Sequence, residues 1–174
     1  MPTPTRTSRD AIVLAGLEIL EDSGPDGLSM RAVADRVGVK APSLYKHVTD
    51  RGALLQLVAE ATADAVASKL GDADDLAGVA RAFRAFAVSR PEGFRLMLSG
   101  TTPTEFSART SAPLLRVASG LAGEAHALAA ARLITAWLTG FVTMELAGAF
   151  QLGGDVDEAF EFGIDRLSTA LTSS

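Results

Sequence analysis

Few residues in this chain have side chains suited to acid–base or metal chemistry. Its 174 residues include no cysteine and two histidines, His47 and His126. A thiolate nucleophile and a thiolate metal site are therefore excluded, and a bound zinc ion would need carboxylates to complete its coordination. We expect neither a metal nor a cofactor.

His126 gives the strongest case for an enzyme, because Glu124 or Glu145 could serve with it in a small helical hydrolase or lyase. No nucleophile elbow, phosphate-binding loop or metal-ligand spacing accompanies these residues. His47 likewise has no serine, acid or metal partner placed for it by the sequence. The sequence therefore predicts a protein that is not an enzyme.

A second set of polar side chains lies on one short predicted helix, residues 41–48. Leu44 and Val48 are one helical turn apart and are expected to face the core. The opposite face then carries hydroxyl, amino and aromatic groups that can donate hydrogen bonds to an external partner. The residues of this outward face are Pro42, Ser43, Lys46 and, in part, Tyr45 and His47.

Another short helix is predicted directly before this one. Residues 30–37 follow Ser29, a good N-cap residue, and end at Gly38. Two short helices joined by a turn have the layout of a helix-turn-helix, whose second helix enters the major groove of DNA. Because short helix pairs are common, the residue types on the outward face support this interpretation more than the spacing does.

Helical periodicity extends along the whole chain, with no convincing alternating strand pattern. The predicted fold class is all-α, with an N-terminal three-helix domain (residues 1–50) joined by a long helix to a C-terminal helical domain (residues 51–174). Pro103 and Pro113 predict a broken helix between Gly100 and Gly123. The other predicted helices cover residues 8–23, 51–70, 76–89 and 92–98, then 124–152, and a final segment that ends at residue 171.

Charge is unevenly distributed. The chain has a net charge of −5, yet its first 51 residues hold seven basic and seven acidic side chains. A surface that meets a polyanion is therefore expected in this neutral first third. The most apolar stretch, residues 133–144, is too short to span a membrane, and the opening MPTPTRTSRD lacks an apolar signal region. We expect a cytoplasmic protein with no membrane partner.

The segment LSMRAVADRVGVKAPSLYKHVTDRGALLQLV, residues 28–58, resembles the DNA-binding domain of the TetR family of transcriptional regulators. Its most specific part is GVKAPSLYKHV, with a Gly-Val turn, a proline that opens the second helix, and the run Leu-Tyr-Lys-His-Val. Two positions depart from the family pattern, because Arg51 replaces the usual lysine and Gly52 stands where an acid or arginine is common. The likeness is close over residues 9–60 and architectural beyond them.

This resemblance implies a homodimeric repressor that reads a palindromic DNA operator and is released by a small molecule. It implies a base contact from Arg31, whereas Lys46, opposite Leu44 and Val48, can reach a guanine edge or a phosphate. Tyr45, His47 and Arg51 are expected to contact phosphates. The full set of DNA-contacting residues is Ser29, Arg31, Lys40, Pro42, Ser43, Tyr45, Lys46, His47 and Arg51. A helical dimer that does not bind DNA is the alternative.

The C-terminal half is expected to bind the inducer. Residues 136–150 are similar to a TetR subgroup named for a Trp-His-Gly motif, with Thr139 at the histidine position. Every phenylalanine lies beyond residue 82, which favours an apolar or aromatic inducer. The predicted pocket residues, which ordinary core packing would explain equally well, are Phe83, Phe86, Phe94, Met97, Trp137, Phe141 and Met144.

The predicted helix over residues 124–152 is apolar nearly all round, so a second face must be buried besides the one in the monomer core. A homodimer through the last two helices would bury it. Gly140 and Gly148 are unfavourable inside a helix unless backbones approach closely there. The predicted interface residues are Gly140, Ala147, Gly148, Phe160, Ile164 and Leu167.

Overall fold

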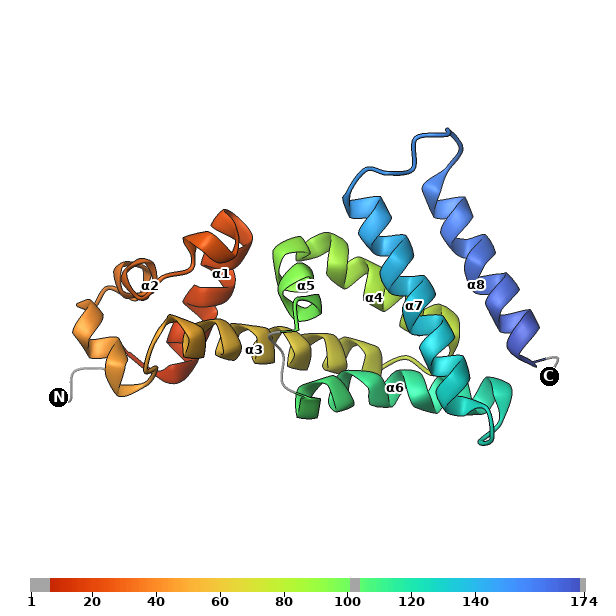
Figure 1. Ribbon diagram of the computed structural model, residues 1–174, viewed down its shortest axis with the longest axis horizontal. Coiled ribbons are helices and arrows are strands. Elements are labelled where there is room, and N and C mark those ends of the chain that lie inside the picture. The colour runs from red at the N-terminus through yellow and green to blue at the C-terminus, as the bar shows by residue number, and fades with distance from the viewer. Residues whose placement is uncertain (1–6, 101–103, 173–174) are drawn as a thin grey trace. The chain divides into compact units, whose positions relative to one another are not determined.

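The computed structural model describes residues 7–100 and 104–172, with the side chains of residues 104–107 and 109 outside the description. The described residues form helices and no strand, which confirms the all-α prediction (Figure 1). The elements are α1 (Arg9–Gly27), α2 (Met30–Val37), the 3-10 helix η1 (Ala41–Lys46), α3 (Arg51–Gly71), α4 (Leu76–Ser89), α5 (Pro91–Leu98), α6 (Thr104–Ala122), α7 (Ala127–Leu146) and α8 (Val156–Thr172).

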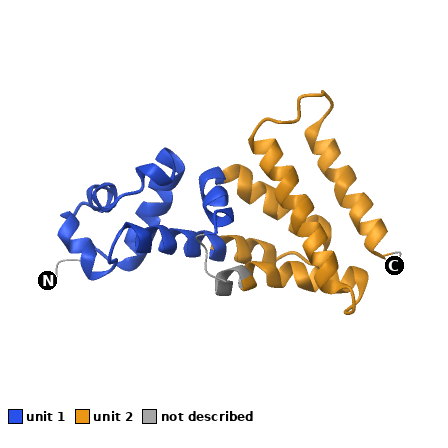
Figure 2. Cartoon of the chain, viewed as in Figure 1, with its two compact units in different colours: residues 1–64, 90–106 blue, residues 65–89, 107–174 orange. Residues whose placement is uncertain are grey.

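The helices fall into two compact units (Figure 2). Unit 1 comprises residues 1–64 and 90–106, and unit 2 comprises residues 65–89 and 107–174. The division lies inside α3, and α5 belongs to the same unit as α1. The predicted boundary between the DNA-binding and C-terminal domains, after residue 50, stays a prediction. A compact unit is defined by its contacts, whereas a functional domain is defined by what it does.

Local signals set the two ends of α1. The Ser8 hydroxyl oxygen accepts a hydrogen bond from the Ala11 amide at 3.1 Å, which satisfies one of the unpaired amides of the first turn. Gly24 adopts a φ of 66°, which breaks the regular helix before Pro25. The regular part of the helix therefore begins one residue after the predicted start and ends where the sequence predicts, and beyond the kink a further turn extends α1 to Gly27.

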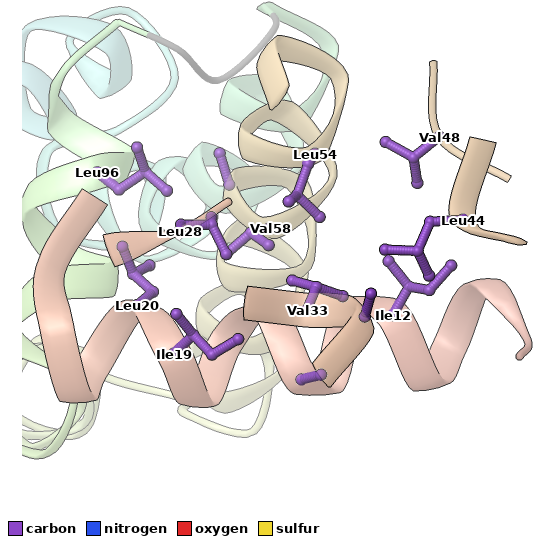
Figure 3. Packing of buried hydrophobic residues seen from close by; sticks show 13 residues of the cluster. Ile12, Ile19, Leu20, Leu28, Val33, Leu44, Val48, Leu54, Val58 and Leu96 are labelled. Atoms are coloured by element: carbon purple, nitrogen blue, oxygen red, sulfur yellow. The ribbon is translucent and has the colours of Figure 1, made fainter. Parts of the chain in front are cut away.

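The core of unit 1 joins α1, α2, η1, α3 and α5 (Figure 3). Its members are aliphatic side chains that recur at helical spacing and are almost completely buried. They include Ile12, Ile19, Leu20, Leu28, Val33, Leu44, Val48, Leu54, Val58 and Leu96. Because Leu44 is the one buried residue of η1, this side chain anchors the short helix to the rest of the unit.

A carboxylate of α1 caps the start of α5. Glu21 accepts hydrogen bonds from the backbone amides of Gly93 at 2.8 Å and Glu92 at 3.2 Å. The amides of a helix's first turn have no intrahelical acceptor, and a negative charge there is favourable. A Cβ at position 93 would lie 3.0 Å from the Glu21 carboxylate and 3.2 Å from the methyl group of Thr62. Glycine at this position lets α5 approach α1 and α3.

An arginine of α4 contacts two other helices of unit 2, α7 and α8. Arg84 of α4 donates from Nε to Glu145 of α7 at 2.7 Å, and its Nη2 lies 2.6 Å from the carboxylate of Asp157 at the start of α8. The guanidinium carbon lies 4.8 Å from the centre of the Phe160 ring. The hydrogen bond to Glu145 raises the pKa of Arg84 above its already high usual range, so the guanidinium stays charged. This group fixes the positions of α7 and α8 on α4.

The helix predicted over residues 124–152 is shorter in the structure. α7 begins at Ala127 and ends at Leu146, and Gly148 takes a φ of 63° just beyond it. The Gly148 amide donates to the Glu145 carbonyl at 2.9 Å, as in a helix that ends on a left-handed glycine. The prediction that Gly148 lies inside a helix is therefore wrong.

The predicted break of the helix at Pro113 is wrong as well, and Pro103, the other predicted break, lies outside the described residues. Residues 104–122 form one helix, α6, with Pro113 inside it. A proline in a helix removes one backbone hydrogen bond, but the Pro113 ring is buried, and burial of its apolar surface offsets part of that loss.

Gly163 of α8 lies directly against Trp137 of α7. A Cβ at position 163 would be 2.2 Å from Cζ2 of the indole. The indole also stacks on Phe160, with the ring centres 5.3 Å apart. Glycine at this position is what allows α8 to approach the indole.

Replacing Gly163 with alanine is therefore expected to lower the free energy of unfolding by about 1–3 kcal/mol, because the indole must move out of its packed position. Denaturant unfolding followed by the fluorescence of Trp137, the single tryptophan of the chain, measures this change. Gly120→Ala is the matched control, since Gly120 is an exposed helical glycine with open space around it. That variant is expected to gain up to about 1 kcal/mol. Equal effects of the two substitutions would contradict the contact.

Candidate nucleic-acid interface

α2 is fixed at both ends by local hydrogen bonds. The Ser29 hydroxyl oxygen accepts from the Ala32 amide at 3.1 Å, which confirms the predicted N-cap. Gly38 follows the helix with a φ of 77°, and the Val39 amide donates to the Ala34 carbonyl at 2.9 Å. A residue with a Cβ would be strained in this left-handed turn. The predicted turn between the two short helices is therefore confirmed.

The second short helix is a 3-10 helix over Ala41–Lys46, in place of the α-helix predicted over residues 41–48. The His47 amide donates to the Leu44 carbonyl at 2.8 Å, three residues back, as in a 3-10 helix. Short helices are often wound this tightly, and Pro42 in the first turn has no amide to donate. The helix is present but shorter and more tightly wound than predicted.

The tighter winding keeps the predicted division into two faces. Leu44 is 0% exposed and Val48 is 3% exposed, whereas Tyr45 is 55% exposed. Ser43 is half-buried, and the exposed residues are Lys40, Pro42, Tyr45, Lys46 and His47. Within the part of the chain that the structure describes, the side chains of Lys40, Tyr45, Lys46 and His47 make no hydrogen bond or ion pair with the protein. They are available to an external partner.

Arg51 has an internal role that the sequence did not predict. Its Nε donates to the carbonyl oxygen of Leu28 at 2.9 Å, and its Nη2 donates to that of Pro25 at 2.6 Å. Both carbonyls belong to the turn that leads from α1 into α2. The phosphate contact of Arg51 stays a prediction, and Nη1 has no partner in the described chain.

The two arginines of α2 have different surroundings. Arg36 donates to Glu18 at 2.9 Å and to Asp22 at 3.0 Å, and these hydrogen bonds, the one to Asp22 first, raise its pKa. It ties α2 to α1. The sequence carries no signal for this contact, because the two acids and the arginine lie on different helices. The Arg31 side chain is 90% exposed and projects away from the protein.

Comparisons with known proteins agree with this geometry. The family model of bacterial regulatory proteins of the tetR family matches residues 12–58, and the model of the tetracyclin repressor-like C-terminal domain matches residues 76–167. The tetracycline repressor protein class A from transposon 1721 of Escherichia coli is 34% identical over 167 residues, which cover 89% of this chain and 76% of that protein. The chain belongs to the TetR family of transcriptional regulators.

Two further relatives span nearly the whole chain. An uncharacterised helix-turn-helix regulator of Mycobacterium tuberculosis is 32% identical, with 97% of this chain and 83% of that protein covered. A single-residue variant of TetR from Acinetobacter baumannii AYE, solved in complex with minocycline, superposes with a TM-score of 0.69 at 29% identity, covering 94% and 96% of the two chains.

Membership of the TetR family makes this chain a DNA-binding transcriptional regulator and not an enzyme, so the helical hydrolase or lyase with His126 is not supported. His126 itself is exposed at the start of α7. The finer assignment to the Trp-His-Gly subgroup stays a prediction.

α7 is longer than the apolar stretch that the sequence analysis considered. It has 20 residues, and an 18-residue window within it has a mean hydropathy of 1.4, so α7 is long and apolar enough to cross a membrane. The core helices of soluble proteins can be equally long and apolar. One face of α7 packs in unit 2, and Glu145 near its end pairs with Arg84. In a TetR-family regulator this helix is better explained by packing than by insertion into lipid.

The predicted pocket residues are divided between the two compact units. Phe94 and Met97 belong to unit 1, and the other five belong to unit 2. Trp137 and Phe141 pack against each other and Phe160, with ring centres 5.1–5.9 Å apart. Two hollows in unit 2 have volumes of about 510 and 270 Å³, and neither is lined by a predicted pocket residue. The inducer site therefore stays a prediction.

The predicted dimer residues divide into buried and exposed members. Phe160 is 1% exposed and Ile164 is 5% exposed, because both pack inside unit 2. Leu167 is half-buried. Gly140 and Ala147 are exposed, and Gly148 is exposed beyond the end of α7. The place of these six residues in a dimer interface stays a prediction.

Sequence reasoning missed the apolar residues that α7 and α8 do expose. Leu133 is 50% exposed and Met144 is 47% exposed on α7, and Phe162 on α8 is 64% exposed. Together with Ala129, Ala136, Gly140 and Ala147, the two α7 residues form one stripe at intervals of three and four residues. We call Ala129, Leu133, Ala136, Gly140, Met144 and Ala147 the outward stripe. The signal was present as this spacing, but it could not be separated from the stripe that faces the core.

The contacts of Arg51 predict a loss of stability in Arg51→Ala. Removal of the guanidinium leaves two carbonyl groups of a tight turn without their donor, which is expected to cost about 1 kcal/mol at this exposed position. Urea unfolding measures the change, and Lys40→Ala, at an exposed lysine with no partner in the described chain, is expected to leave stability unchanged. An unchanged midpoint together with a weaker salt dependence of DNA binding would instead assign Arg51 to phosphate.

Proposed function

We propose that this chain acts as a homodimeric repressor that reads a palindromic operator and leaves it when a small apolar molecule binds. The observation that supports the proposal most is the division of faces around η1. Leu44 and Val48 are buried in unit 1, while Tyr45, Lys46 and His47 are exposed. A helix-turn-helix presents its second helix to the major groove in this way.

Each exposed side chain matches a part of DNA. Arg31 and Lys46 are long donors suited to the N7 and O6 acceptors of guanine. Tyr45 and His47 are suited to phosphate oxygens, which position the protein without reading sequence. The remaining proposed contacts come from Ser29, Lys40, Pro42 and Ser43, with Arg51 contributing through Nη1.

The outward stripe of α7 supports the homodimer. The opposite side of α7 is already buried against α4 and α8, so the stripe is a second apolar face without a partner in the described chain. Its small residues Ala136 and Gly140 would let two helices approach closely. Phe162 adds an exposed aromatic ring on α8. Two copies of the chain joined here would present two helix-turn-helix units to the DNA, as a palindromic operator requires.

Two observations support an apolar or aromatic inducer. All phenylalanines lie beyond residue 82, and unit 2 gathers Trp137, Phe141, Phe150 and Phe160 into one aromatic cluster. The names of two similar proteins include a polycyclic ligand. One is a tetracycline repressor, and the other is a TetR variant in complex with minocycline. A polycyclic aromatic molecule is the class of inducer that we infer.

The alternative, a helical dimer that does not bind DNA, leaves the face of η1 unexplained. Lys40, Lys46, Tyr45 and His47 would then be exposed side by side with no partner. The basic side chains exposed in this region also favour DNA. Arg36 already pairs with Glu18 and Asp22, so the remaining basic groups of α2 and η1 project outward.

The roles of Lys46 and Tyr45 can be separated by binding measurements. Lys46→Ala is expected to weaken binding to the operator by about tenfold and to relax the preference for one base pair in each half-site, because a base contact is lost. Tyr45→Phe removes one hydroxyl and is expected to weaken binding to all sequences equally. Titration of operator and mutated duplexes at several salt concentrations measures both. Unchanged specific binding in Lys46→Ala would place Lys46 outside the groove.

The dimer interface is tested with Ala136→Arg, which places a large charged side chain in the centre of the outward stripe. We expect a folded monomer with strongly reduced operator affinity, since one reading head cannot hold both half-sites. Light scattering after size exclusion gives the mass, and the same substitution at the exposed Ala125, in the turn before α7, is the control. A dimer that survives Ala136→Arg would place the interface elsewhere.

A further inference from the structure

Arg31 and Asp35 form an exposed pair on α2. They are four residues apart, and the Asp35 carboxylate oxygen lies 3.9 Å from Nε of Arg31. Their side chains are 90% and 73% exposed, so the pair projects from the surface of unit 1. An exposed pair of this kind contributes little to stability. The pair matters for the orientation of the Arg31 guanidinium.

The contact leaves one end of the guanidinium unoccupied. In the described chain, Arg31 meets Asp35 through Nε, and neither of its Nη atoms has a partner within the protein. The distance of 3.9 Å between Nε and the carboxylate oxygen fits an ion pair and is too long for a hydrogen bond. A guanidinium is planar with its donors in a fixed fork, so an acid that attracts the Nε side turns the two Nη groups outward together. Two parallel donors facing outward match the N7 and O6 acceptors of guanine in the major groove.

The other arginine of α2 shows the opposite arrangement. Arg36 uses both Nη atoms on the acids of α1, at 2.9 and 3.0 Å, and has no outward pair of donors. The acidic partner of Arg31 instead lies on the same helix and reaches the inner nitrogen. A carboxylate at this exposed position also repels phosphate, so it disfavours a sequence-independent contact from the same helix face.

We propose that Asp35 is a positioning residue for sequence readout: it holds Nε of Arg31 so that the two Nη groups face a guanine. The proposal rests on the proposed DNA-binding function. It assigns to Asp35 part of the specificity of the regulator, although Asp35 itself touches no base.

The experiment starts by finding the operator. The full-length protein is used to select binding sequences from a pool of random duplex DNA, and Arg31→Ala then identifies the base pair that Arg31 reads. A selection that enriches no sequence would overturn the proposed function. With a sequence in hand, the affinity for the operator, for duplexes altered at that base pair, and for unrelated DNA is measured for each variant.

In the native protein, we expect the base pair that Arg31 reads to be preferred over the other base pairs by about tenfold. Asp35→Ala is expected to lose most of this preference. Its binding to unrelated DNA is expected to become tighter. Asp35→Glu keeps a carboxylate within reach of Nε and is expected to retain the preference. Asp26→Ala removes an exposed acid with no partner in the described chain and is expected to leave the discrimination unchanged.

If Asp35 is only a solvated charge with no positioning role, we expect a different result. Asp35→Ala would then bind every duplex more tightly by the same factor, with its discrimination intact, and that outcome would overturn the proposal. Loss of discrimination in both Asp35→Ala and Asp35→Glu would overturn it too. Circular dichroism and thermal unfolding of each variant verify that α2 is folded.

Discussion

The burial of Leu44 is the constraint on which the DNA-reading surface depends. η1 has six residues and no side-chain cap, and a helix this short is not stable on its own. One leucine in the core shared by α1, α2 and α3 fixes its orientation, and Val48 fixes the chain that leaves it. Every other side chain of η1 is directed by these two contacts. The chemistry of the exposed face thus follows from hydrophobic packing on the opposite side.

The basic residues of unit 1 serve two purposes that a count of charges cannot separate. The first 51 residues are neutral, which predicts weak attraction to DNA as a whole. In the structure, Arg36 is paired with two acids and Arg51 binds two carbonyls of the α1–α2 turn. These two arginines therefore stabilise the packing of unit 1. Arg31, Lys40 and Lys46 remain for an external polyanion, so the surface is more basic than the composition indicates.

The sequence predicts those features that depend on neighbouring residues. Ser29 caps the helix that follows it and Gly38 ends that helix, because caps and left-handed turns are properties of a few consecutive residues. Features set by distant contacts were missed. Phe160 and Phe162 are two residues apart on α8, and their sequence surroundings do not reveal that the first packs on Trp137 while the second is exposed. Arg51 likewise meets carbonyls 23 and 26 residues earlier in the chain.

The neutral charge of the reading segment has a consequence for regulation in the proposed homodimer. A single head with few basic groups releases few counterions, so its affinity for any one half-site is modest. Joining two heads makes the second contact intramolecular, which raises the affinity by orders of magnitude only while the spacing fits one turn of DNA. The outward stripe of α7 is therefore as important for operator binding as η1 itself. An inducer that alters the spacing need not disturb a single base contact to release the protein.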